Sequence, residues 1–142
     1  MAQLYWDDVK EGQEFSTLEE TPSQRLVIWA AASGDFYQIH YDDNFAKGNN
    51  LPDIIVHGAL KGMLVGRLLD EWIGDQGKIV RWGVSYRGMD RAREPITVWG
   101  RVTKKYEQDG QALVDLDMGV RQADGKTETT PGKATVALPK KQ

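Results

Sequence analysis

Two histidines and a nearby aspartate are the side chains of this sequence best suited to proton transfer. His40 and His57 are its two histidines, and Asp35 lies five residues before His40. A carboxylate and an imidazole at this spacing can converge on one water molecule, so that the carboxylate takes a proton while the imidazole holds the water and relays a proton. Spacing alone does not establish this chemistry, because an aspartate after a helix end and a histidine in a loop are more often structural.

A second candidate feature is the segment Val56-His57-Gly58-Ala59, at the start of a predicted helix. Free N–H groups and the positive end of a helix dipole can stabilise an oxyanion. Gly58 has no Cβ and would let a carbonyl oxygen approach the backbone closely. Alternatively, Gly58 only permits tight packing between helix and sheet, and His57 is a hydrogen-bonded structural histidine. The residues leave both interpretations open.

The sequence lacks the residues that several other kinds of catalytic or metal site require. The chain has no cysteine, which excludes a thiolate nucleophile, a disulfide framework and cysteine-ligated metals. The two histidines do not have a metal-binding spacing such as His-Glu-x-x-His, and neither a Gly-x-Ser-x-Gly elbow nor a phosphate loop is present. We therefore expect no metal.

The elements that would position Asp35 and His40 are a helix and a loop. Thr21 can cap a helix in which Pro22 takes the first position and Gln24 the third, and Gly34 is a natural terminator. The stretch 35–56 is predicted to be loop-rich, with a short helical turn over 44–47 that Asp42 or Asp43 could cap.

A second, longer helix is predicted from His57 to Trp72, ending before Gly74. Its small residues lower helix propensity. They indicate close approach by other backbone, as in a helix wrapped by a sheet; they are Gly58, Ala59, Gly62 and Gly66.

Alternating apolar and polar residues predict strands in the second half of the chain, and Asp109-Gly110 and Asp124-Gly125 supply hairpin turns between them. The predicted strands cover 80–87, 96–103, 114–121 and 134–138. The predicted order is helix, long helix and antiparallel meander with one buried face. This is an α+β layout with helices against one face of the sheet.

Length and charge limit the class of protein. A chain of 142 residues fits one domain, 1–142, and should bury about 70% of its unfolded surface. We see no secretory signal and no membrane-length apolar run, and expect a cytoplasmic protein without membrane contact. Residues 78–105 hold eight basic side chains against two acidic ones. Because the net charge is −3, this segment suggests a small polyphosphorylated ligand or a solvated strand face, and not nucleic acid.

The segment from Ser33 to Asp42 resembles the signature of the MaoC-like (R)-specific enoyl-CoA hydratases, Gly-Asp-x-Asn-Pro-aliphatic-His-x-Asp. Downstream, Val56-His57-Gly58 resembles the aliphatic-His-Gly at the start of the family's central helix, and the similarity runs over nearly the whole chain. The first motif is matched by Gly34, Asp35, Ile39, His40 and Asp42.

The resemblance implies a hotdog fold, an antiparallel sheet wrapped around a long central helix. It also implies hydration of a 2,3-enoyl thioester, with coenzyme A as part of the substrate and no separate cofactor. Asp35 would activate water for attack at C3, His40 would bind that water and help deliver a proton to C2, and the Gly58 N–H would stabilise the thioester oxygen. The family forms dimers by joining sheets edge to edge, so we expect a homodimer or a higher homo-oligomer. The basic segment 78–105 could then meet the phosphates of coenzyme A.

Two positions in the motif depart from the family pattern. Tyr37 and Gln38 stand where the family has Asn and Pro, and without the proline the turn is more mobile unless packing replaces the constraint. The turn at Arg93-Glu94-Pro95 is also atypical. These departures concern the substrate more than the reaction.

Three other functions stay open at the level of sequence. The chain could be a catalytically quiet hotdog subunit that shapes the pocket of an active partner, although such partners usually lack the Asp/His pair. It could be an acyl-CoA thioesterase, although Asp70 and Glu71 are poorly placed for the carboxylate that these enzymes carry on the central helix. It could also be an acyl-CoA binding module.

Overall fold

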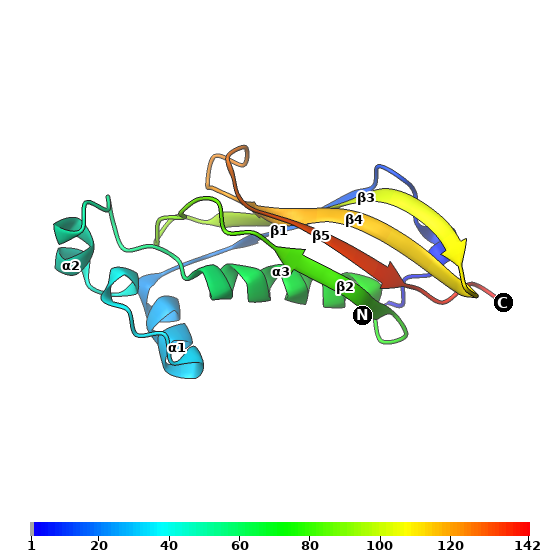
Figure 1. Cartoon of the computed structure of the whole chain (residues 1–142), viewed down its shortest axis with the longest axis horizontal. Helices are drawn as coiled ribbons and strands as arrows, with labels where there is room; N and C mark the ends of the chain where they lie inside the picture. The colour runs from blue at the N-terminus through cyan, green and yellow to red at the C-terminus, as the bar shows by residue number, and fades with distance from the viewer. Residues whose placement is uncertain (1) are drawn as a thin grey trace.

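Five strands form one antiparallel sheet, and the helix α3 lies against one face of it (Figure 1). The computed structural model describes residues 2–142. The helices are α1 (Ser23–Ser33), α2 (Asp43–Gly48) and α3 (Gly58–Ile73), with single 3₁₀ turns at Trp6–Asp8 and Gln38–His40. The strands are β1 (Glu14–Glu19), β2 (Lys78–Val84), β3 (Ile96–Gln108), β4 (Gln111–Arg121) and β5 (Glu128–Ala137). The α+β hotdog layout expected from the sequence is confirmed.

The order of the strands corrects two expectations. The sheet runs β1-β3-β4-β5-β2, so only the last three strands of the predicted meander pair in sequence order. The strand β2 pairs with β5 at the far edge, and residues 85–95 form a long connection to β3 in place of a tight hairpin. The edge strand β1 was not predicted. Burial alternates along this strand, but residue type does not follow it, because the apolar Leu18 is exposed and the charged Glu19 is buried.

Packing of α3 against the sheet forms the core. One side of this helix buries apolar side chains that meet apolar residues of β3, β4 and β5. Burial of each such side chain contributes about 1.5–3 kcal/mol, which is what fixes the helix to the sheet. The helix residues are Leu60, Leu64, Val65, Leu69 and Ile73, and the strand residues include Val98, Leu116, Val120 and Val136.

The glycines of α3 have a different partner from the one predicted. A Cβ added to Gly62 would lie 2.7 Å from the Tyr86 hydroxyl, and one added to Gly66 would lie 3.1 Å from the Trp82 ring. The close approach is therefore made by aromatic side chains of β2 and the segment after it, and not by backbone. A larger residue at Gly62 or Gly66 would require the Tyr86 or Trp82 side chain to move away from the helix.

The ends of α1 and α2 show which predicted caps form. Gly34 ends α1 in the left-handed conformation (φ 81°), and the Asp42 carboxylate caps α2 by accepting from Phe45 N. The predicted Thr21 cap is wrong, because Pro22 occupies the cap position. The Thr21 hydroxyl is buried and donates to the Glu94 carbonyl oxygen at 2.9 Å. This residue therefore ties the start of α1 to the loop before β3.

Within residues 2–142, none of the helices combines the length and the apolar character needed to cross a membrane.

Candidate active site

The structure brings together side chains from three separate segments. Asp35 directly follows α1, His40 ends the 3₁₀ turn before α2, and His57 immediately precedes α3. Each of these three side chains has one ring nitrogen or carboxylate oxygen that lies within 4.8 Å of the corresponding atoms of the other two. The end of one helix, a short turn and the start of the central helix thus meet at one point.

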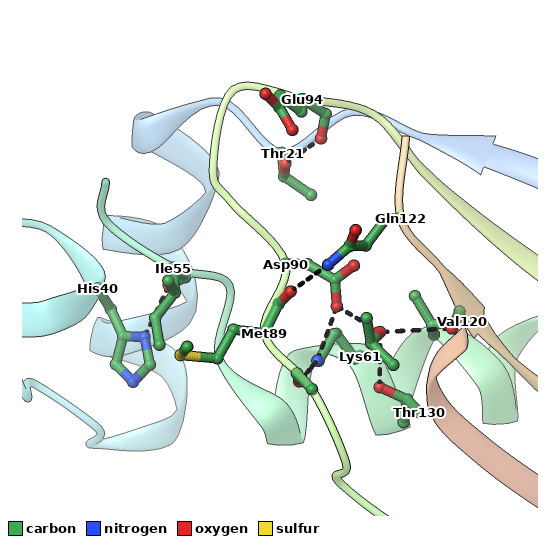
Figure 2. A network of polar contacts seen from close by, with 12 residues as sticks. Thr21, His40, Ile55, Lys61, Met89, Asp90, Glu94, Val120, Gln122 and Thr130 are labelled. Atoms are coloured by element: carbon green, nitrogen blue, oxygen red, sulfur yellow. Dashed lines mark hydrogen bonds and ion pairs between the residues drawn. The ribbon is translucent and has the colours of Figure 1, made fainter. Parts of the chain in front are cut away.

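The backbone sets the orientation of His40. Its Nδ1 lies 2.8 Å from the carbonyl oxygen of Ile55 (Figure 2). Because a carbonyl oxygen only accepts hydrogen bonds, Nδ1 carries the proton and donates it. In the neutral ring, Nε2 is then an acceptor, and it lies 3.7 Å from Oδ2 of Asp35. This contact with Ile55 was missed from the sequence, since any residue type offers a carbonyl oxygen.

Asp35 combines one fixed oxygen with one that faces His40. The N–H of Tyr37 donates to Oδ1 at 3.3 Å, while Oδ2 faces the imidazole. The Asp35 side chain is 46% exposed and His40 is buried. Since a carboxylate in contact with solvent and an enclosed imidazole flank the same space, a water molecule can reach both.

Hydrogen bonds replace the missing proline of the family motif. The His40 N–H donates to the Tyr37 carbonyl oxygen at 3.1 Å, and the Asp42 N–H donates to that of Gln38 at 2.9 Å. The Tyr37 ring also packs edge-on against His40 and Phe45. The turn is therefore held by its backbone and by this aromatic packing, which supplies the constraint that Gln38 itself does not.

His57 supports His40 rather than facing the open side. The two rings are stacked, with centroids 3.8 Å apart. His57 Nε2 donates to the Asp35 carbonyl oxygen at 3.3 Å, and Nδ1 is buried with no hydrogen-bond partner among residues 2–142. Burial, followed by the neighbouring His40, lowers the pKa of His57 from its ordinary value of 6.5. We therefore assign His57 a neutral ring that buttresses His40 and Asp35.

The lowered pKa of His57 predicts acid sensitivity of the fold. Below about pH 6.5 this ring is protonated in the unfolded chain, whereas in the folded chain it stays neutral to a lower pH. The unfolded state therefore binds more protons. The free energy of unfolding should fall as pH decreases from about 7.5 to 5.5, by at most about 1.4 kcal/mol per pH unit from this group. Urea unfolding at a series of pH values measures it. His57→Gln should make the free energy of unfolding depend less steeply on pH. An equal dependence in the wild type and the variant would contradict a lowered pKa for His57.

The Gly58 N–H is available to a ligand. Gly58 is the first residue of α3, a helix of 16 residues, and an N–H at this position has no acceptor within its own helix. The residue before it, His57, makes no side-chain cap. The N–H lies at the positive end of the helix dipole, beside the ring of Tyr86, which would be 3.2 Å from a Cβ added to Gly58. It can stabilise a developing oxyanion.

The same three side chains form a poor metal site. The rings of His40 and His57 are stacked with planes only 20° apart, so their in-plane lone pairs do not point to a common centre. One nitrogen of each ring is also held by a carbonyl oxygen. The geometry favours proton transfer over the tetrahedral coordination that histidine-rich sites use; that the protein binds no metal stays a prediction.

The basic segment 78–105 gives mixed support for a phosphate site. Arg93 is paired with Asp43 and Asp53 at 3.1 and 2.8 Å. Lys105 donates to the Val9 carbonyl oxygen and lies over the Trp6 ring. Because these two cations already have structural partners, a phosphate-bearing ligand would have to be met by other members of the segment.

Comparison with known proteins agrees with the fold and with the family resemblance. The sequence model of the MaoC like domain family matches residues 7–123. The (R)-hydratase of A. caviae, described as involved in PHA biosynthesis, superposes with a TM-score of 0.82 at 23% identity, covering 93% of this chain and 98% of that one. The unliganded R-hydratase of Pseudomonas aeruginosa gives 0.86 at 20% identity, covering 98% and 88%. At these identities, the superpositions show a shared fold.

A curated sequence relative is far longer than this chain. The β subunit of a fatty acid synthase from Dothistroma septosporum is 32% identical over 72 residues, which are 49% of this chain and 4% of that subunit. The family match spans both the Asp35–His40 segment and the start of α3. With that coverage, the chain belongs to the MaoC like domain family.

Proposed function

We propose that this protein adds water reversibly across the 2,3 double bond of an enoyl thioester, with coenzyme A as the thiol portion of the substrate. The observation that carries the proposal is the 3.7 Å separation between Asp35 Oδ2 and His40 Nε2. This distance is too long for a direct hydrogen bond, but one water oxygen can lie within hydrogen-bonding distance of both atoms. Membership of the family supports the same reaction.

In this reaction, the water would donate one hydrogen to Asp35 and the other to Nε2 of His40. Both groups then act as acceptors and leave an oxygen lone pair free to attack C3. Asp35 takes a proton as the C–O bond forms. The new hydroxyl lies between the two groups, so it accepts that proton from Asp35 and passes its own to His40 Nε2, which donates it to C2. One OH and one H have been added, and both residues return to their starting state.

Attack at C3 moves negative charge to the thioester oxygen, which the Gly58 N–H would stabilise. This donor belongs to the rigid start of α3 and needs no reorganisation when the charge appears. The sequence relative is, by its name, a subunit of a fatty acid synthase. This name supports an acyl thioester as the substrate.

A homodimer joined through the β2 edge is part of the proposal. Within residues 2–142, β2 has a strand partner on one side only. Val80, Trp82 and Tyr86, on β2 and just after it, are 52%, 40% and 56% exposed. An apolar open edge is normally covered, and pairing with a second copy does this by symmetry.

Adding a charge at this edge should prevent the pairing. We expect the wild-type protein to sediment at twice the chain mass, and Val80→Lys to shift it to the monomer at micromolar concentration. Leu18→Lys places the same charge on β1, the opposite edge, where Leu18 is 70% exposed, and should leave the dimer intact. Dissociation by Leu18→Lys alone would place the interface at β1.

The activity is tested by incubation with crotonyl-CoA and with longer enoyl-CoAs, following loss of the conjugated thioester absorbance. Hydration supports the proposal. Release of free thiol would instead support a thioesterase, although Asp70 lies about 18 Å along the α3 axis from Gly58, at 1.5 Å per residue. Activity that requires a second hotdog chain would support the partner-subunit function, and binding without turnover the binding module.

A further inference from the structure

A buried ion pair between α3 and the loop after β2 has no role in the proton transfers described above. Nζ of Lys61 donates to Oδ2 of Asp90 at 2.8 Å, and the two side chains are 2% and 1% exposed (Figure 2). We propose that this pair is a positioning device. It holds in place the carbonyl oxygen of Ile55, which accepts from His40, and the first turn of α3. The inference rests on the proposed function for its effect on turnover.

Stability alone does not account for such a pair. Removing two charges from water costs several kcal/mol per ion, and replacing a buried pair by apolar residues of similar volume is often neutral or stabilising. The carboxylate is also incompletely satisfied, since Oδ1 of Asp90 has no hydrogen-bond partner among residues 2–142. A buried charge pair fixes geometry in a way that apolar packing does not, because its hydrogen bonds are directional.

The pair joins three elements. Lys61 Nζ also donates to the carbonyl oxygen of Gly88 at 3.1 Å, and the hydroxyl of Thr129, on β5, donates to Asp90 Oδ2 at 2.6 Å. The loop that follows β2 is therefore fixed to α3 on one side and to the sheet on the other.

The backbone of the same residues continues to the candidate site. The Asp90 carbonyl oxygen accepts from Val56 N at 2.9 Å, and Lys61 N donates to the His57 carbonyl oxygen at 3.2 Å. These two bonds and the ion pair close a ring of contacts around the first turn of α3. Ile55, which accepts from His40 Nδ1, forms an isolated bridge with Arg91 next to Asp90.

Two catalytic features depend on this ring of contacts. The position of the Ile55 carbonyl oxygen decides which nitrogen of His40 carries the proton, and the position of Val56 decides where the Gly58 N–H points. Misplacement by about 1 Å can reduce turnover by about 100-fold. Neither Lys61 nor Asp90 needs to touch the substrate.

The test measures the His40 tautomer directly, by ¹⁵N NMR of the histidine rings, together with kcat and KM for crotonyl-CoA. The double variant Lys61→Met/Asp90→Asn removes both charges at nearly constant volume. We expect it to fold, to lose the predominant Nδ1–H form of His40, and to lower kcat about 10- to 100-fold with a smaller effect on KM. Lys133→Met, which removes the exposed pair between Lys133 and Asp117, should change none of these.

Thr129→Val keeps both charges and removes one hydrogen bond to Asp90, so the test does not depend on the double variant folding. We expect a smaller shift in the same direction, about threefold in kcat. A wild-type tautomer signal and wild-type kcat in a folded double variant would overturn the proposal, and so would an unshifted signal in Thr129→Val if the double variant does not fold. If the wild-type protein hydrates no enoyl-CoA, the proposed function fails while the tautomer signal still decides the positioning role.

Discussion

Asp35→Asn should lower the rate of crotonyl-CoA hydration about 10²- to 10⁴-fold, the range that a positioned general base contributes. The amide has nearly the same shape as the carboxylate but cannot take a proton from water. Because Asp35 Oδ1 is fixed by Tyr37 N, we expect the loop to stay in place and KM to change little. The loss of conjugated thioester absorbance gives both constants.

His40→Ala should produce a loss of similar size, because the same water depends on both residues. The two effects should not add: Asp35→Asn/His40→Ala should be little slower than either single variant, as in other groups of residues that act as a unit. Asp117→Asn removes a carboxylate of β4 that pairs with the exposed Lys133 and is the matched control. If both single variants keep most of the wild-type rate, this pair does not carry the reaction.

Gly58→Pro should lower kcat about 10²- to 10³-fold, the usual effect of removing one oxyanion donor. Proline takes away the N–H yet suits the first position of a helix. It also favours extended backbone in the residue before it, and His57 already has φ −57° and ψ 135°. The helix should therefore form normally, which circular dichroism checks, while the enolate-like oxygen loses its donor.

Gly58→Ala separates the lost donor from the added bulk. Alanine keeps the N–H but places a Cβ 3.2 Å from the Tyr86 ring, a contact that a small ring movement relieves. We expect its kcat to exceed that of the proline variant by at least tenfold. Equal losses in both variants would mean that Gly58 serves close packing and not oxyanion binding, the alternative that the sequence left open.

Local features of the fold could be predicted from sequence because their causes lie within a few residues. Gly34 ends α1, Asp42 caps α2, and Asp109-Gly110 forms the turn between β3 and β4 with φ values of 53° and 78°. Each depends on a short-range preference, such as a left-handed backbone conformation or a side chain that accepts from a nearby N–H. The end of α3 before Gly74 follows in the same way.

Features that depend on distant partners could not be predicted. Thr21 was expected to cap α1, yet its hydroxyl donates to Glu94, 73 residues away. The strand β2 was expected to begin a meander, yet it joins the sheet beside β5. In both cases, local preference is outweighed by a contact that exists only after the chain has folded.

The pair Asp35 and His40, with its order and spacing, was determined by the sequence, as was the glycine at the start of α3. The tertiary structure decided which nitrogen of His40 faces Asp35 and how close the two groups lie. It did so through the Ile55 carbonyl oxygen and the ring of His57. A backbone carbonyl is the same in every residue, and stacking needs two segments to meet. Spacing in the sequence therefore indicates which side chains can react, whereas only long-range packing sets the orientation that lets them do so.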